Sequence, residues 1–298
     1  MALTVLVSFS RAIAGELIGS QPIVSSPTER TAVSSSKAIE NGEAIASDGD
    51  VLVLGEDHTN EGLAKTVLAT LKTLGSPAQY NCLFIEAPHD VQDEVEAKTR
   101  AGDVDGFFKS LSKAADSAVR KGYNEVGFTD KDLETTEFVN IDRKTAPVDA
   151  SVMEFSRRYN VPIIAYDSAS SSPEFEASMA GNISELYLGQ TKESQRRKLD
   201  AVSRRNQKMA ANISRDMKVR SCKKAIVLVG WGHLLTTKYL DQYGIRNFKT
   251  LQSELKARDL KSNVAIVRRD PQAPKIRFEK TSEWRERFDD FTGEIRNP

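Results

Sequence analysis

Ionisable side chains follow directly after four short apolar runs of this sequence. The runs begin at residues 51, 82, 161 and 225, and the groups that follow them are Glu56, His58, Glu86, Asp167 and His233. Apolar runs of this length are typical of strands that are buried on both faces of a parallel sheet. Carboxylates and imidazoles that meet at one point of a fold can transfer protons or bind a metal ion. These residues are therefore the candidates for chemistry.

Two of the three histidines share one pattern. His58 and His233 each stand in a Gly-x-x-His sequence directly after an apolar run, whereas His89 does not. One such histidine alone is more often a structural, hydrogen-bonded imidazole, but the repeat of the pattern favours a functional role. Glu56 lies two residues before His58, so on an extended chain the two side chains point to the same side and could share a metal ion or a proton. His89 is near enough to Glu86 in sequence to line the site, but we expect it at the surface.

A long helix is predicted to begin near residue 193. Its apolar face is formed at helical spacing by Leu199, Val202, Met209, Ile213 and Met217. Arg205 and Asn206 interrupt this face. A buried guanidinium is costly unless a carboxylate or a ligand anion meets it. Arg205 therefore either bridges to Glu86 or Asp167 to hold the fold, or binds a substrate oxyanion, and we expect Asp167 and Asn206 to contact substrate.

The apolar runs alternate with helical patterns. Strands are expected at about 51, 82, 161, 225 and 264, and helices at about 61–74, 91–121, 148–159, 174–218 and after 233. This alternation predicts an α/β fold with a mostly parallel central sheet flanked by helices. In such sheets, ligands bind beyond the carboxyl ends of the strands, where the polar groups named above would gather in one pocket.

The chain is predicted to hold one folded domain after a leader. Residues 20–49 are rich in serine and lack periodicity, so we expect residues 1–48 to form a disordered, flexible leader that could serve as a secretion signal. Residues 49–298 form the α/β domain, with a helical or irregular insertion at about 88–147. Cys82 and Cys222 each adjoin an apolar run, and we expect them to be buried free thiols.

Composition excludes several classes of protein. Basic and acidic residues balance at 42 each, with a pI near 6.9, so no overall field attracts nucleic acid. No apolar run is long enough to span a bilayer, and we expect no transmembrane segment. Phosphate-binding loops, dinucleotide fingerprints and the Gly-x-Ser-x-Gly elbow are also missing from the sequence.

The motifs LGEDH, FIE, RNQKMAANI and VGWGH, in this order, resemble the superfamily of Tiki and TraB-type proteins, ChaN-like haem-binding proteins and erythromycin esterases. The resemblance implies one pocket formed by Glu56, His58, Glu86, Arg205 and His233. The serine-rich leader and the whole sequence look similar to HopBA-type type III effectors of plant-pathogenic bacteria. This similarity implies secretion into a host cell, where the protein would act on a host protein or a small molecule and trigger cell death.

The resemblance leaves the chemistry open, because members of the superfamily include hydrolases and haem binders. The leading hypothesis is an ester or peptide hydrolase, in which His58 activates water, Arg205 stabilises the oxyanion, and Glu86 and His233 orient the reactants. In a metal variant, His58, His233 and Glu56 would bind Mn, Co or Zn. A haem site would need His58, His233 or Tyr166 as an axial ligand. The remaining alternative is a host-protein-binding protein with an inactive site.

Overall fold

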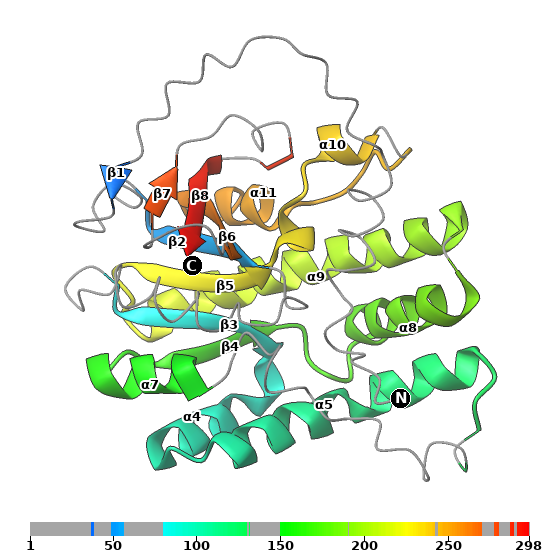
Figure 1. Ribbon diagram of the computed structural model, residues 1–298, viewed down its shortest axis with the longest axis horizontal. Helices are drawn as coiled ribbons and strands as arrows, with labels where there is room; N and C mark the ends of the chain where they lie inside the picture. Colours follow the sequence, from blue (N-terminus) through cyan, green and yellow to red (C-terminus); the bar gives the residue numbers. More distant parts are fainter. Residues whose placement is uncertain are drawn as a thin grey trace.

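The computed structural model describes residues 37–38, 49–56, 80–129, 131, 150–189, 191–241, 244–269, 277–279, 287–288 and 291–297 (Figure 1). Within these residues the chain forms one eight-stranded sheet with the order β1-β7-β8-β6-β2-β5-β3-β4. The strands are β1 (Lys37–Ala38), β2 (Val51–Glu56), β3 (Cys82–Pro88), β4 (Ile163–Asp167), β5 (Ala225–Gly230), β6 (Ser262–Arg269), β7 (Arg277–Glu279) and β8 (Phe291–Asn297).

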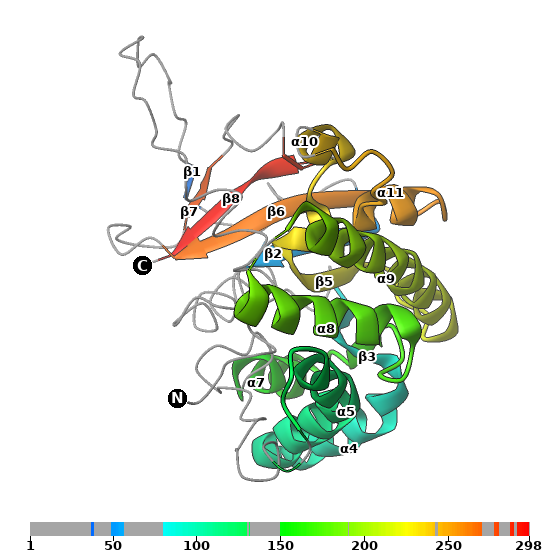
Figure 2. The same ribbon diagram turned by 90° about the vertical axis from the view of Figure 1, so that its right-hand side faces the viewer.

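The strands from β8 to β4 pair in parallel, and only β7 and β1 join antiparallel. Helices lie on both sides of the sheet (Figures 1 and 2). They are α4 (Gln92–Ala101), α5 (Val104–Glu125), α7 (Ala150–Tyr159), α8 (Pro173–Leu188), α9 (Lys192–Val219), α10 (Thr237–Asp241) and α11 (Leu251–Lys256). The predicted α/β fold with a mostly parallel sheet is confirmed, and the predicted helix at 61–74 lies outside the described residues.

Alternate residues of each central strand enter two different cores. Val51 and Val53 of β2 pack in the core that also contains α8, α9 and α11. Leu52 and Leu54 pack on the opposite face, together with α4 and α7. Because side chains alternate along a strand, a run that is apolar throughout supplies both faces at once. The predicted apolar face of α9 is confirmed, since its five residues all lie in the first core.

The helices predicted over about 91–121 are α4 and α5 in the structure, with a break between them at residues 102–103. α4 ends where Gly102 adopts a left-handed backbone with φ 69°, a conformation that suits glycine because it lacks Cβ. α5 then begins with Asp103 as its N-cap, whose Oδ1 accepts a hydrogen bond from the Gly106 backbone N–H at 2.8 Å. The cause of the break is therefore local, a C-terminal glycine followed directly by a capping aspartate.

Side-chain amides bind the backbone of β4, the last strand in the sheet order. Gln92 Nε2 donates to the Ile163 carbonyl at 3.1 Å, and Gln92 Oε1 accepts from the Ala165 N–H at 2.6 Å. Farther along the strand, Asn212 Nδ2 donates to the carbonyls of Tyr166 and Asp167 at 3.1 and 3.2 Å. These bonds satisfy an edge that would otherwise expose unpaired backbone groups. They also fix the strand end that carries the Asp167 side chain.

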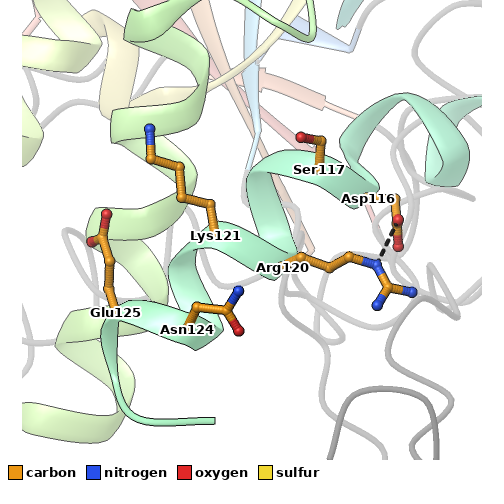
Figure 3. A pocket seen from close by; sticks show the side chains of 6 residues that line it. All are labelled: Asp116, Ser117, Arg120, Lys121, Asn124 and Glu125. Carbon is orange, nitrogen blue, oxygen red and sulfur yellow. Dashed lines mark hydrogen bonds and ion pairs between the residues drawn. The ribbon is translucent and has the colours of Figure 1, made fainter. Parts of the chain in front are cut away.

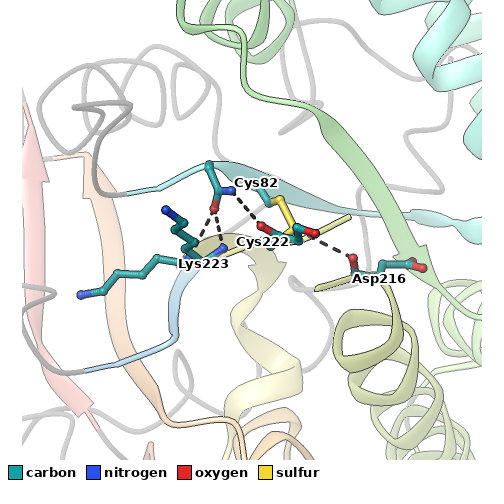
Figure 4. The surroundings of a disulfide bond; sticks show 7 residues. Cys82, Asp216, Cys222 and Lys223 are labelled. Atoms are coloured by element: carbon teal, nitrogen blue, oxygen red, sulfur yellow. Dashed lines mark hydrogen bonds between the residues drawn. A yellow bond between two sulfur atoms is a disulfide. The ribbon is translucent and has the colours of Figure 1, made fainter. Parts of the chain in front are cut away.

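The expectation of free thiols is wrong, because Cys82 and Cys222 form a disulfide with their Cα atoms 5.8 Å apart (Figure 4). Cys82 is the first residue of β3 and is paired with Ala225 of β5. Cys222 lies three residues before Ala225, so the parallel pairing of these strands brings the two cysteines together although 140 positions separate them in sequence. Sequence spacing alone could not reveal that β3 and β5 are neighbours.

We expect reduction of this disulfide to lower the melting temperature. A cross-link that closes so long a loop restricts the unfolded chain, which typically stabilises a protein by about 2–5 kcal/mol. Thermal unfolding measured with and without a reductant checks this expectation. The Cys82→Ser, Cys222→Ser double variant is the control. It should melt at the temperature of the reduced protein, and the reductant should not change that temperature. An equal melting temperature for the oxidised and reduced wild-type protein would contradict the expectation.

At both ends of the predicted domain, the sheet contains strands that the sequence did not predict. β1 lies inside the predicted leader 1–48 and pairs with β7, so these two residues belong to the sheet. β7 and β8 extend the sheet beyond the last strand that the sequence predicted. The boundaries of the leader and of the insertion at 88–147 stay predictions. Within the described ranges, no helix combines the length and the apolar character needed to cross a membrane.

Candidate active site

The carboxyl ends of four neighbouring strands carry the polar groups that the sequence singled out. β2, β5, β3 and β4 lie side by side in parallel, so their ends meet at one edge of the sheet. Glu56 ends β2 opposite Gly230, and Asp167 ends β4 opposite Pro88. Glu86 lies in the last part of β3. His233 follows β5 in the short 3-10 helix Trp231–Leu234.

Arg205 of α9 connects the ends of β3 and β4 from above the sheet. Its Nε and Nη2 donate to the two carboxylate oxygens of Asp167, and Nη2 also lies 3.2 Å from Glu86 Oε1. Nη1 donates to the Ser178 hydroxyl of α8 at 3.0 Å, and the guanidinium lies over the ring of Phe175. Arg205 is only 1% exposed. Of the two alternatives predicted for Arg205, the structure shows the bridge to the carboxylates, and the binding of a substrate oxyanion stays a prediction.

The surrounding charges and burial shift the pKa values of Arg205 and Tyr166. Burial by itself would lower the pKa of Arg205, but the adjacent Asp167 and Glu86 carboxylates raise that pKa above its usual value. Tyr166, next to Asp167 in β4, has a pKa well above the usual value because of its burial and then because of Glu86, Asp167 and Glu56. The Tyr166 hydroxyl therefore stays protonated and donates to the Leu228 carbonyl at 2.8 Å.

His233 is completely buried and contacts residues of both α9 and β3. Its Nδ1 lies 2.5 Å from Asn206 Oδ1. Its Nε2 lies 3.2 Å from Glu86 Oε1, close enough for an ion pair although outside the angular range of a hydrogen bond. The second oxygen of Glu86 accepts the Gly230 backbone N–H at 2.8 Å. Glu86 thus lies between the guanidinium of Arg205 and the imidazole of His233.

The structure therefore brings together five of the residues that the sequence proposed, namely Glu86, Asp167, Arg205, Asn206 and His233. Glu56 is buried at the end of β2, 1% exposed, and is close enough to influence the pKa of Tyr166. His58 lies outside the described residues, so its part in the site stays a prediction. The substrate-binding roles of Asp167 and Asn206 also stay predictions.

His89 is not the surface residue that the sequence suggested. It is half-buried, and its Nδ1 lies 3.0 Å from the Asp167 carbonyl and 3.5 Å from Asn212 Nδ2. The reason is that β3 and β4 are neighbours, so the turn after β3 lies against the end of β4.

Sequence reasoning missed Asn212 and Ser178, which both support the cluster. The signal for Asn212 was available, because a residue seven positions after Arg205 lies on the same helix face. Nothing in the sequence marked Ser178.

The described donors do not fit a metal ion or haem iron. No group of three or more His, Cys, Asp or Glu side chains within the described ranges is arranged to hold a metal. Both ring nitrogens of His233 face protein atoms, and the Tyr166 hydroxyl is bound to Leu228. Either residue would have to give up a contact before it could bind a metal, whereas His58, the third predicted ligand with Glu56 and His233, lies outside the described residues.

A separate hollow lies on α5, away from the strand ends in sequence (Figure 3). It is lined by Asp116, Ser117, Arg120, Lys121, Asn124 and Glu125. Arg120 pairs with Asp116 on the same helix, and Lys121 pairs with Glu176 of α8, both at 2.8 Å. These are solvent-exposed ion pairs of the kind that contribute little stability. None of the strand-end residues lines this hollow, and we assign it no part in the chemistry.

Comparison with known proteins gives two similar solved structures. No protein-family profile matches the chain, and no curated protein matches it. The type III effector HopBA1 is similar with a TM-score of 0.48 and 14% identity, over 85% of this chain and 89% of that one. A Bacillus cereus protein is similar with a TM-score of 0.39 and 13% identity, over 83% of this chain and 75% of that one.

Proposed function

We propose that this chain is a hydrolase of ester or peptide bonds with its active site at the carboxyl ends of β2, β5, β3 and β4. The observation that carries the proposal is the position of Glu86, 3.2 Å from Arg205 Nη2 and 3.2 Å from His233 Nε2. A carboxylate in contact with both a permanent cation and an imidazole can take part in general acid–base catalysis. All three groups lie where open α/β sheets bind their ligands.

In the proposed reaction, water adds to the substrate carbonyl and the bond to the leaving group breaks. His58 takes a proton from the attacking water, as its Gly-x-x-His position suggests. Glu86 and His233 orient the reactants and pass a proton to the leaving oxygen or nitrogen. The proton that His58 gains replaces the one that the leaving group receives, so the site returns to its starting charge after one turnover.

Arg205 has two roles in this proposal. It fixes Glu86 and Asp167, because its nitrogens contact both carboxylates. Its positive charge also stabilises the oxyanion that develops on the substrate, and such charges act strongly where water is excluded. Direct donation from Arg205 to the oxyanion would require one of its present contacts, with Asp167, Glu86 or Ser178, to open first.

The experiment that tests this function is a hydrolysis screen of the purified chain. Chromogenic esters of increasing acyl size and a set of fluorogenic peptides are supplied, each with added Mn, Co or Zn and with a chelator. We expect turnover of at least one ester or peptide class that the chelator does not abolish. Turnover that needs a metal would overturn the metal-free mechanism, and the absence of turnover across the screen would speak for the second candidate function below.

We further propose that the protein acts inside a host cell after secretion. The support comes from the serine-rich, aperiodic composition of residues 20–49 and from the similarity of the leader and the whole sequence to HopBA-type effectors. Expression of the full chain in plant leaf tissue tests this proposal. We expect cell death in tissue that expresses the wild-type chain. If the tissue stays healthy although the protein accumulates, the proposed host effect is wrong. This result would leave the proposed hydrolase function untested.

A second candidate function is binding of a host protein without catalysis. The observation that favours it is burial, because Arg205 and His233 are 1% and 0% exposed and their contacts can be explained as structural. A network of this kind could be an inherited site that now serves only the fold. Variants that melt normally and keep the host response while lacking the proposed catalytic groups would support this function.

A further inference from the structure

Both the nitrogen and the oxygen of the Asn206 side-chain amide contact other residues. The residue is fully buried on α9, next to Arg205. Its Nδ2 donates to the carbonyls of Lys249 and His233, at 2.7 and 3.3 Å. Its Oδ1 lies 2.5 Å from His233 Nδ1. Because carbonyl oxygens only accept hydrogen bonds, the two carbonyl partners determine which end of the amide is nitrogen, and Oδ1 must face the imidazole.

This orientation determines where the imidazole carries its hydrogen. Oδ1 of an asparagine only accepts, so the short contact is favourable when His233 Nδ1 donates. Nε2 is then the nitrogen that faces Glu86 Oε1 at 3.2 Å. Nε2, on the side of the ring away from Asn206, is therefore the nitrogen left for proton exchange.

We propose that Asn206 is a positioning residue that holds the hydrogen of His233 on Nδ1 and thereby assigns proton exchange to Nε2 and Glu86. The catalytic consequence rests on the proposed hydrolase function, whereas the location of the hydrogen is a property of the fold alone. Asn206 thus acts on the reaction through His233. This differs from the substrate-contacting role that the sequence suggested for it.

A purely structural role for Asn206 can be separated from this positioning role. Asn206 also holds Lys249, through the carbonyl of that residue. The hydroxyl of Ser203, three residues earlier on α9, holds the same residue by accepting the Lys249 N–H at 2.8 Å. The Ser203 side chain is not one of the partners of His233 found within the described residues. Ser203→Ala is therefore a matched control that loosens Lys249 and leaves the hydrogen bond to the imidazole intact.

The test is nitrogen NMR of the histidine side chains in the full-length protein labelled with ¹⁵N. The chain has three histidines, so variants at His58 and His89 assign the signals of His233. We expect the Nδ1 signal of wild-type His233 to be that of a nitrogen carrying hydrogen. In Asn206→Ala this signal should move toward that of a nitrogen without hydrogen, since in an isolated imidazole the hydrogen prefers Nε2. Ser203→Ala should keep the wild-type signal.

The outcomes that overturn the proposal do not depend on enzymatic activity. If Nδ1 of His233 in the wild-type protein carries no hydrogen, the proposal is wrong. This measurement needs only the wild-type protein, so it can be made even if Asn206→Ala fails to fold. The same Nδ1 signal in a folded Asn206→Ala variant would also overturn it. Asn206→Asp keeps an acceptor for Nδ1, so it should retain the hydrogen there. If the hydrogen is located as expected but no substrate is hydrolysed, the positioning role holds and only the proposed function fails.

Discussion

Replacing Arg205 with methionine is expected to lower the free energy of unfolding by about 3–5 kcal/mol, the usual cost of removing one partner from a buried ion pair. The side chain is 1% exposed and contacts the carboxylates of both Asp167 and Glu86. Without the guanidinium, two buried carboxylates would face each other with no cation between them. Denaturant unfolding followed by circular dichroism measures the change.

The neighbouring residue provides a matched control for this substitution. Arg204 is exposed on the same helix, so Arg204→Met should change the free energy of unfolding by less than about 0.5 kcal/mol. Adding Asp167→Asn and Glu86→Gln to the Arg205→Met chain should restore part of the lost stability, because the uncompensated charges are then gone. Equal stability of the Arg204 and Arg205 single variants would show that the buried ion pairs do not hold the fold.

The His58→Ala variant is expected to lose about 10²- to 10⁴-fold in hydrolysis rate, the usual contribution of a general base. Its melting temperature should stay near that of the wild type, because the proposed role of His58 is chemical and not one of packing. The assay uses the ester or peptide that the screen identifies, at equal concentrations of folded protein. A thermal melt of each sample accompanies the rate measurement.

Two other outcomes for His58→Ala would each change the account. If the melting temperature and the rate fall together, His58 supports the fold and is not shown to be the base. If the variant melts normally and keeps its full rate, His58 has no catalytic role, and binding of a host protein through the surface becomes the better explanation. The response of host tissue to the variant then decides whether the effector activity survives without the site.

The sequence predicted the central strands well because their apolar runs are short, continuous and closed by polar residues. The side chains of residues 51–54 point alternately into two cores, so every position of this run needs an apolar residue. The buried face of α9 could also be predicted, because five apolar residues lie on it at helical spacing. Arg205 stood out because a cation on that face requires an anionic partner, and the strand ends offered the only obvious ones.

Features that depend on which strands are neighbours could not be predicted. The disulfide between Cys82 and Cys222 requires β3 to lie beside β5, and nothing local in the sequence records this pairing. The half-buried position of His89 likewise depends on β3 lying beside β4. The sequence placed Glu86 near both Arg205 and His233 but gave no means of knowing that one carboxylate would contact both. Such contacts are set by tertiary packing.

The most direct test of the central claim is the hydrolysis rate of Glu86→Gln beside that of the wild-type chain. Glutamine has the shape of glutamate but cannot carry the charge or exchange the proton that the contact with His233 requires. We predict a rate at least about 100-fold lower, together with a single cooperative unfolding transition that shows a folded variant. A folded Glu86→Gln variant that hydrolyses substrate at the wild-type rate would contradict the account.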